Sequence, residues 1–79
     1  HVYITLENLN NRQFAQTDPE KFLKAYENEH GLILDEIQHV PQLLSYIQTH
    51  IDMFDRPGYF ILTGSQNFIV HQSVSQTLA

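Results

Sequence analysis

The segment Gly31–Glu36 reads Gly-Leu-Ile-Leu-Asp-Glu, and it decides the fold of this chain. Its apolar run does not alternate with polar residues, which is typical of a strand buried on both faces of a mainly parallel sheet. The run stops at two adjacent carboxylates, Asp35 and Glu36. The segment therefore predicts a central strand that delivers two acidic side chains to one edge of a sheet.

Two further segments predict strands before and after this one. Residues 2–6 read Val-Tyr-Ile-Thr-Leu and residues 59–63 read Tyr-Phe-Ile-Leu-Thr, and both are rich in β-branched and aromatic side chains. A short helix over about residues 10–16 and a second from Asp18 to about His30 separate the first two strands. Asp18 is the expected N-cap of that second helix, and Pro19 suits its first position.

Pro41 opens a third, strongly periodic helix between the second and third strands, and helical turns are also expected after Asn67 and Ser73. The order of strands and helices predicts an α/β fold, with about three parallel strands and right-handed crossovers in a three-layer α/β/α arrangement. In such a sheet, helices are expected on both faces.

The apolar face of the third helix has two interpretations. Its members are Leu43, Leu44, Ile47 and Ile51. A stripe at this spacing is more often core than interface, so we favour packing against the sheet. The alternative is a non-enzymatic interaction module that uses the same face as a groove for a partner.

Composition excludes several functional classes. The 79 residues have a formal charge of −5 and contain no cysteine. The lack of cysteine excludes disulfides and thiolate metal sites and favours a cytoplasmic protein. The four cations, Arg12, Lys21, Lys24 and Arg56, do not cluster, so direct nucleic-acid binding by this segment is not expected. No apolar run is long enough to cross a membrane. Because the chain starts at His1 and stops within a helical pattern, we expect a fragment of a single larger domain.

Polar residues follow each predicted strand: Glu7 after the first, Asp35 and Glu36 after the second, and Ser65 and Gln66 after the third. The carboxyl ends of parallel strands form the functional crevice of open α/β sheets. Adjacent carboxylates at that place suit magnesium-phosphate chemistry, since one can hold the cation and the other can orient or deprotonate a water. The alternative is structural, with Asp35 as a helix cap and Glu36 as a favourable charge in a first turn.

Three motifs carry a resemblance over essentially the whole chain. Residues 31–38, 41–46 and 60–67 resemble the Walker B strand, the following helix and the sensor strand of bacterial and archaeal AAA-superfamily P-loop ATPases, in the group with an additional C-terminal domain. The resemblance implies that residues 1–79 are part of an AAA-type ATPase domain that binds ATP and Mg²⁺. It implies that Asp35 is the magnesium ligand, that Glu36 is the water-activating base, and that Ser65 or Gln66 is the sensor, with Gln66 favoured. It leaves a protein partner and a homo-oligomer open, and Arg12 receives no catalytic role and is expected to pair with Glu7 or Asp18.

The chain lacks two parts of the family pattern. No Gly-x-x-x-x-Gly-Lys loop occurs in the 79 residues, so we expect it before His1, and we expect the arginine that reaches a neighbouring subunit beyond Ala79. The isolated chain is therefore expected to be inactive and to carry no bound Mg²⁺ or ATP, because its two carboxylates alone hold the cation only weakly. Rival sites are weaker, because two Glu-x-x-His pairs lie too close together for a di-iron bundle and Ser65 lacks a Gly-x-Ser-x-Gly context.

Overall fold

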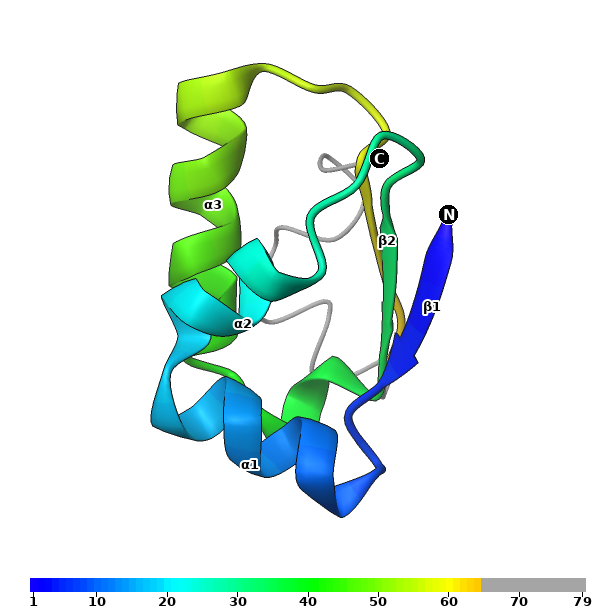
Figure 1. The fold of residues 1–79 in the computed structure, drawn as a ribbon, viewed down its shortest axis with the longest axis vertical. Coiled ribbons are helices and arrows are strands. Elements are labelled where there is room, and N and C mark those ends of the chain that lie inside the picture. Colours follow the sequence, from blue (N-terminus) through cyan, green and yellow to red (C-terminus); the bar gives the residue numbers. More distant parts are fainter. Residues whose placement is uncertain (65–79) are drawn as a thin grey trace.

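The computed structural model describes residues 1–64 (Figure 1). The elements, in chain order, are β1 (Val2–Thr5), α1 (Leu9–Thr17), α2 (Pro19–Ala25), β2 (Leu32–Asp35), the 3-10 helix η1 (Ile37–His39), α3 (Leu43–Phe54) and β3 (Phe60–Leu62). The helical turns expected after Asn67 and Ser73 lie outside the described residues. No helix in residues 1–64 has the length and apolar character needed to cross a bilayer.

The strands form one sheet in the order β1-β2-β3, and both pairs are parallel. The register aligns Ile4 with Leu34, and Leu34 with Leu62. This arrangement confirms the predicted α/β class and shows that consecutive strands are neighbours in the sheet. All three strands therefore end at the same edge.

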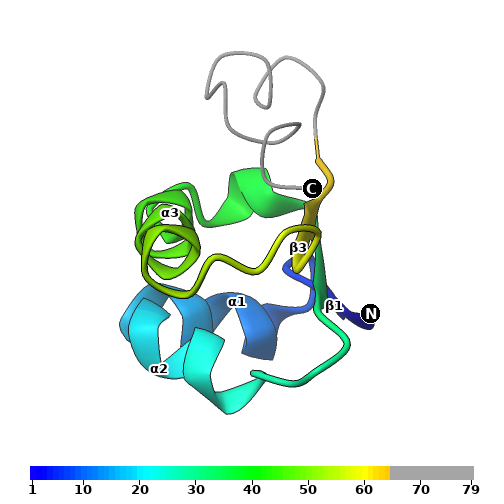
Figure 2. The ribbon, with the colours of Figure 1, turned by 90° about the horizontal axis from the view of Figure 1, so that it is seen from above.

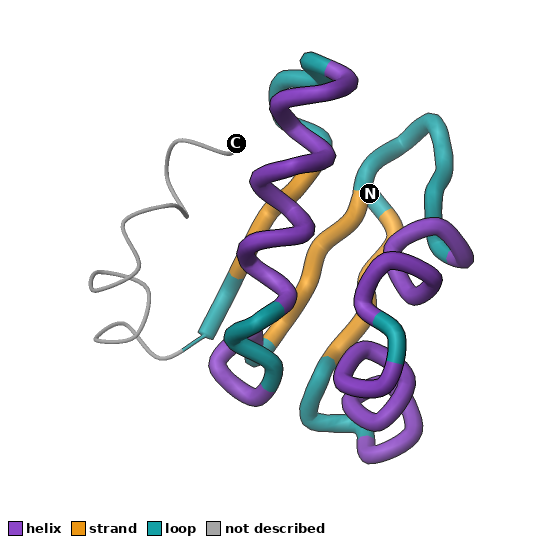
Figure 3. Tube along the Cα trace, turned by 90° about the vertical axis from the view of Figure 1, so that its left-hand side faces the viewer, coloured by secondary structure: helices purple, strands orange, loops and turns teal. Residues whose placement is uncertain are grey.

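Helices α1, α2 and α3 cover one face of this sheet, which is plain when the molecule is seen from above (Figure 2). In Figure 3, α3 lies over the β3 side, and α1 and α2 lie over the β1 side. The physical reason is topological, because right-handed crossovers between strands that advance in one direction put their helices on the same face. In the described part of the chain, helices thus cover one face of the sheet, whereas they were expected on both faces.

The two faces of the sheet differ in burial as a result. Leu32 and Leu34 of β2 are fully buried beneath the helices, whereas Ile33 between them is only half-buried. Ile33 is in register with Tyr3 of β1 and Ile61 of β3. These three side chains form a row across the open face, and Tyr3 is 59% exposed.

Local capping explains where the first helices begin. The side chain of Asn8 accepts a hydrogen bond from the backbone N–H of Asn11 and caps α1. Asp18 accepts one from the N–H of Lys21, and Pro19 follows as the first residue of α2, as predicted. Helix α2 ends at Ala25, well before the expected end near His30.

The early end of α2 has a long-range cause. The side-chain oxygen of Asn28 accepts hydrogen bonds from the backbone N–H groups of His30 and Gly31, which holds the chain in a turn. The N–H of Asn28 donates to the hydroxyl of Tyr59, 3.0 Å away and 31 residues later in the chain. Tertiary contact therefore replaces the last helical turn that the sequence predicts.

The core lies between the sheet and the three helices. Phe22 of α2 is fully buried and makes edge-to-face contacts with Phe14 and Tyr26 at centroid distances of 5.4 and 5.2 Å. The buried core residues are Ile4, Leu6, Ala15, Phe22, Leu23, Leu32, Leu34, Ile37, Val40, Leu43, Leu44, Ile47, Tyr59, Phe60 and Leu62. Leu43, Leu44 and Ile47 belong to this core, and Ile51 packs against it, so the interaction-module interpretation of that helix face is wrong.

Candidate functional site at the strand ends

The carboxyl ends of the strands place Asp35 between two neighbours. Asp35 is in register with Thr5 of β1. On the other side, the N–H of Thr63 donates to the carbonyl of Leu34, 3.0 Å away, which sets Thr63 beside Asp35 at the end of β3. Among the described residues, polar side chains therefore lie on both sides of Asp35 at this edge, but they are Thr5 and Thr63 rather than the predicted Glu7, Ser65 and Gln66.

Two hydroxyl groups hold the Asp35 carboxylate. The hydroxyl of Thr63 donates a hydrogen bond to Oδ1 at 2.5 Å, and the hydroxyl of Tyr3 donates one to Oδ2. These two hydrogen bonds, with that of Thr63 the larger effect, lower the pKa of Asp35 below its usual value. The bond to Asp35 also raises the pKa of the Tyr3 hydroxyl. Asp35 is thus an ionised acceptor at neutral pH, as a cation ligand must be.

Glu36 lies directly after β2 in a left-handed backbone conformation, with φ of 59°. Its side-chain Oε1 accepts a hydrogen bond from Nε2 of Gln38 at 2.7 Å, and the residue is half-buried. The next N–H, of Ile37, donates to the carbonyl of Thr63 at 2.9 Å. The chain therefore turns sharply after Asp35 and stays against the end of β3.

The structural alternative makes Asp35 a helix cap and Glu36 a favourable charge in a first helical turn, and neither assignment holds. Glu36 occupies the N-cap position of η1, but its side chain makes no capping hydrogen bond there. Asp35 is a strand residue whose strongest contacts are the hydroxyls of Tyr3 and Thr63. A helix cap therefore does not account for Asp35, and η1 has no acidic residue in its first turn.

Glu7 and Arg12 lie in the loop and helix that follow β1. The guanidinium of Arg12 donates from Nε to the carbonyl of Leu6 at 3.0 Å and from Nη2 to the carbonyl of Glu7 at 3.2 Å. The expected pairing of Arg12 with the carboxylates of Glu7 or Asp18 is thus replaced by bonds to the backbone. Arg12 stabilises the turn between β1 and α1, and Glu7 is exposed.

The carboxylates at this edge suit Mg²⁺ better than a metal with an all-protein cage. Within residues 1–64, no group of three or more His, Cys, Asp or Glu side chains is placed to hold a metal ion, so the two Glu-x-x-His pairs do not assemble a site. Mg²⁺ commonly keeps several waters and takes only one or two carboxylates, with phosphate oxygens completing its shell. The ionised, hydrogen-bonded Asp35 fits that requirement.

The predicted sensor residues, Ser65 and Gln66, lie outside the described residues. Gly64, the last residue described, packs closely against the turn after β2. A Cβ atom at position 64 would overlap the side-chain amide of Gln38 and lie 3.3 Å from Cγ2 of Ile37. The end of β3 therefore runs directly beside the segment that carries Glu36.

Sequence reasoning missed two members of this site, Tyr3 and Thr63, and treated both as ordinary strand residues. A signal for them exists in the two-residue period of strands. Side chains two apart share a face, so Asp35 and Ile33 point to the same side, and the in-register neighbour of Ile33 is Tyr3. The register itself, however, could not be read from the sequence.

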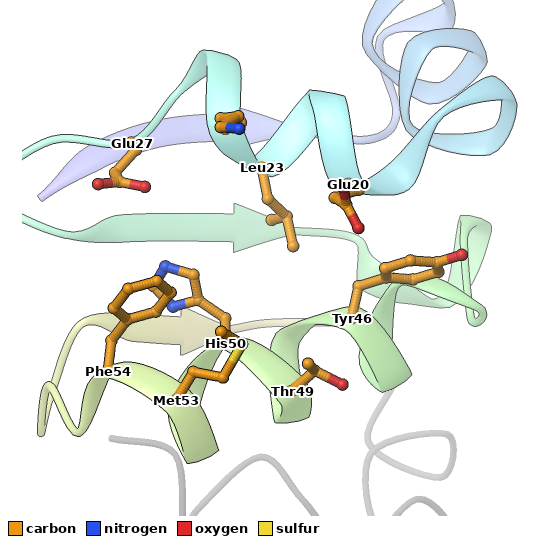
Figure 4. A pocket seen from close by; sticks show the side chains of 9 residues that line it. Glu20, Leu23, Glu27, Tyr46, Thr49, His50, Met53 and Phe54 are labelled. Atoms are coloured by element: carbon orange, nitrogen blue, oxygen red, sulfur yellow. The ribbon is translucent and has the colours of Figure 1, made fainter.

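A separate groove lies between α2 and α3, away from the strand ends (Figure 4). Its volume is about 300 Å³, and Leu23 and His50 lie at its centre. The residues that line it are Glu20, Leu23, Lys24, Glu27, Tyr46, Thr49, His50, Met53 and Phe54. None of the strand-end residues lines this groove, so the two features are distinct.

Comparison with known proteins bears on the family of the chain. No curated protein and no solved structure matches the chain. The family model described as AAA domain matches residues 1–79. This match covers the whole chain, whose described part contains the parallel β1-β2-β3 sheet. The chain belongs to the AAA domain family of P-loop ATPases.

Proposed function

We propose that this chain supplies the magnesium-holding and water-activating part of an ATP-hydrolysing AAA domain. The observation that carries the proposal is the Asp35 carboxylate, ionised and held by hydroxyls from both neighbouring strands, with Glu36 directly after it. Asp35 is the proposed Mg²⁺ ligand, and Glu36 is the proposed general base. Ser65 or Gln66 is the proposed sensor that contacts the terminal phosphate, and the amide of Gln66 has the longer reach.

The two carboxylates have different tasks. Asp35 holds the cation, directly or through one of its waters, and a bound Mg²⁺ would neutralise charge on the β- and γ-phosphates. Glu36 accepts a proton from the water that attacks the γ-phosphate, as a positioned general base does. Its hydrogen bond from Gln38 restrains the carboxylate at the strand end. The left-handed backbone at Glu36 turns the chain directly after Asp35. We propose that this turn lets the two adjacent carboxylates take different positions and so different tasks.

In the proposed ATPase, the phosphates of the nucleotide are bound mainly by residues of a complete AAA domain other than these 79. Residues 1–79 contain no Gly-x-x-x-x-Gly-Lys, the loop whose backbone N–H groups and Lys surround the phosphates. We therefore propose hydrolysis for the complete domain, in the cytoplasm, coupled to a protein partner or to a homo-oligomer. The Asp35 segment itself is not proposed to contact nucleic acid.

The test uses a complete AAA domain that contains this chain together with its glycine-rich loop. Glu36→Gln should leave nucleotide binding nearly intact while slowing hydrolysis by about 10² to 10⁴. Asp35→Ala should instead weaken the dependence on Mg²⁺. Glu29→Gln is the matched control, because Glu29 is exposed and lies in the turn before β2. If Glu36→Gln hydrolysed ATP at the parental rate, Glu36 would not be the base.

A further inference from the structure

Tyr3 and Thr63 reach Asp35 from opposite sides and by different routes. Thr63 lies beside Asp35, directly after β3, so its short side chain is long enough to bring the hydroxyl to Oδ1. Tyr3 is aligned with Ile33, two residues before Asp35, and must reach diagonally. Aromatic side chains span such diagonal neighbours in a sheet, and here the ring carries the hydroxyl to Oδ2.

The direct β1 neighbour of Asp35 does not supply this bond. Thr5 is in register with Asp35, but its Oγ1 accepts a hydrogen bond from the N–H of Glu7 at 3.2 Å. The Thr5 hydroxyl thus serves the loop after β1. The bond to Asp35 from the β1 side comes from Tyr3.

Packing does not explain either hydroxyl. Tyr3 is 59% exposed and lies outside the core, and Thr63 is also outside it. The structural bonds of Thr63, to Leu34 and Ile37, use its backbone N–H and carbonyl and leave the side chain free for another task. What the two hydroxyls share is the carboxylate of Asp35.

We infer that Tyr3 and Thr63 are positioning residues for the cation ligand Asp35. This inference rests on the proposed function. Each Asp35 oxygen accepts one hydrogen bond from a hydroxyl group, which fixes the plane of the carboxylate and leaves lone pairs on each oxygen for a cation or its water. Neither residue touches the cation. Their effect is to hold the ligand in one orientation before the cation binds.

The experiment titrates the 79-residue chain with Mn²⁺, a paramagnetic probe for a magnesium site, and follows the broadening of backbone amide signals by NMR. In the parent chain, signals near Asp35 should broaden first. Tyr3→Phe and Thr63→Val should each require about tenfold more Mn²⁺ for the same broadening, which is the usual effect of removing a partner of a metal ligand. Thr63→Ser keeps a hydroxyl and should retain parental affinity.

Two further variants complete the design. Tyr46→Phe is the matched control for Tyr3→Phe, since it removes a partly exposed hydroxyl from α3, and it should leave the titration unchanged. Asp35→Asn should abolish the local broadening. If it does not, the proposed magnesium ligand is wrong. If Asp35→Asn removes the broadening but Tyr3→Phe and Thr63→Val bind Mn²⁺ like the parent, the positioning role alone is overturned.

Discussion

The imidazole of His50 stacks on the ring of Tyr59, with centroids 5.4 Å apart and 23° between the ring planes. The same imidazole contacts Phe54 and Phe60, at centroid distances of 4.7 and 5.3 Å. This aromatic cluster joins α3 to the start of β3. A protonated imidazole is poorly accommodated there, and burial lowers the pKa of His50.

The lowered pKa of His50 predicts that acidification destabilises the chain. The pKa of His50 in the folded chain lies below the unfolded value of about 6.5. The neutral imidazole therefore stabilises the fold fully above about pH 6.5, and this contribution to the free energy of unfolding is lost as pH falls through the folded pKa. The weaker charge effects oppose each other, because Glu27 raises the pKa and Arg56 lowers it. The free energy of unfolding, measured with urea, should depend less on pH for His50→Phe than for the parent chain. The control His30→Gln, at an exposed site, should keep the parental dependence.

Two glycines with positive φ should respond very differently to alanine. Gly31 has φ of 97°, and a Cβ there would lie 2.6 Å from the carbonyl oxygen of Tyr59, which accepts the N–H of Leu32 between β2 and β3. Gly58 has φ of 75° and open space around its Cβ position. Gly58→Ala should cost about 1 kcal/mol, and Gly31→Ala roughly 3 kcal/mol because the strands must also separate. If the two variants had equal urea midpoints of unfolding, the larger cost predicted for Gly31→Ala would be wrong.

The outer edge of β3 should promote self-association of the 79-residue chain. In residues 1–64, β3 pairs only with β2, which leaves one edge without a neighbouring strand. An apolar unpaired edge is a template for another chain, so association is expected at concentrations up to about a millimolar. Sedimentation should show dimers or larger species, and Ile61→Lys should reduce them because a charge on an edge strand opposes pairing. A parental chain that sediments as a monomer throughout would contradict the prediction.

The chain without a glycine-rich loop should bind Mg-ATP weakly. Its strand-end side chains, Glu7, Asp35 and Glu36, are negative and repel the phosphates unless a cation lies between them. We expect a Kd above about 1 mM, which is less than roughly 4 kcal/mol of binding free energy, and no hydrolysis. Titration calorimetry checks the affinity. Micromolar binding would show that the nucleotide site is misplaced.

Local sequence signals were enough to predict the three strands and that they are parallel. Each strand is a short apolar run, and Pro19, Pro41 and Pro57 mark helix starts or the turn between elements. Asp18 caps α2 as expected, because a cap depends only on residues within one turn. The carboxylates at the end of β2 follow from the same local pattern.

What the sequence did not reveal depends on contacts between distant residues. Helix α2 stops early because Asn28 binds Tyr59. The hydroxyls of Tyr3 and Thr63 act at the site because the register brings them to Asp35 from 32 and 28 residues away in the chain. Such pairings arise when strands align, and no short-range pattern specifies the alignment.

At Glu36, the residue that would best stabilise the left-handed backbone differs from the residue that the proposed chemistry requires. A side chain at such a φ is less favourable than glycine by about 1 kcal/mol or more, so Glu36→Gly should relax the turn after β2. The same change would remove the carboxylate proposed as the base. Backbone stability alone favours glycine here, and the presence of glutamate is therefore better explained by what its side chain does than by what its backbone needs.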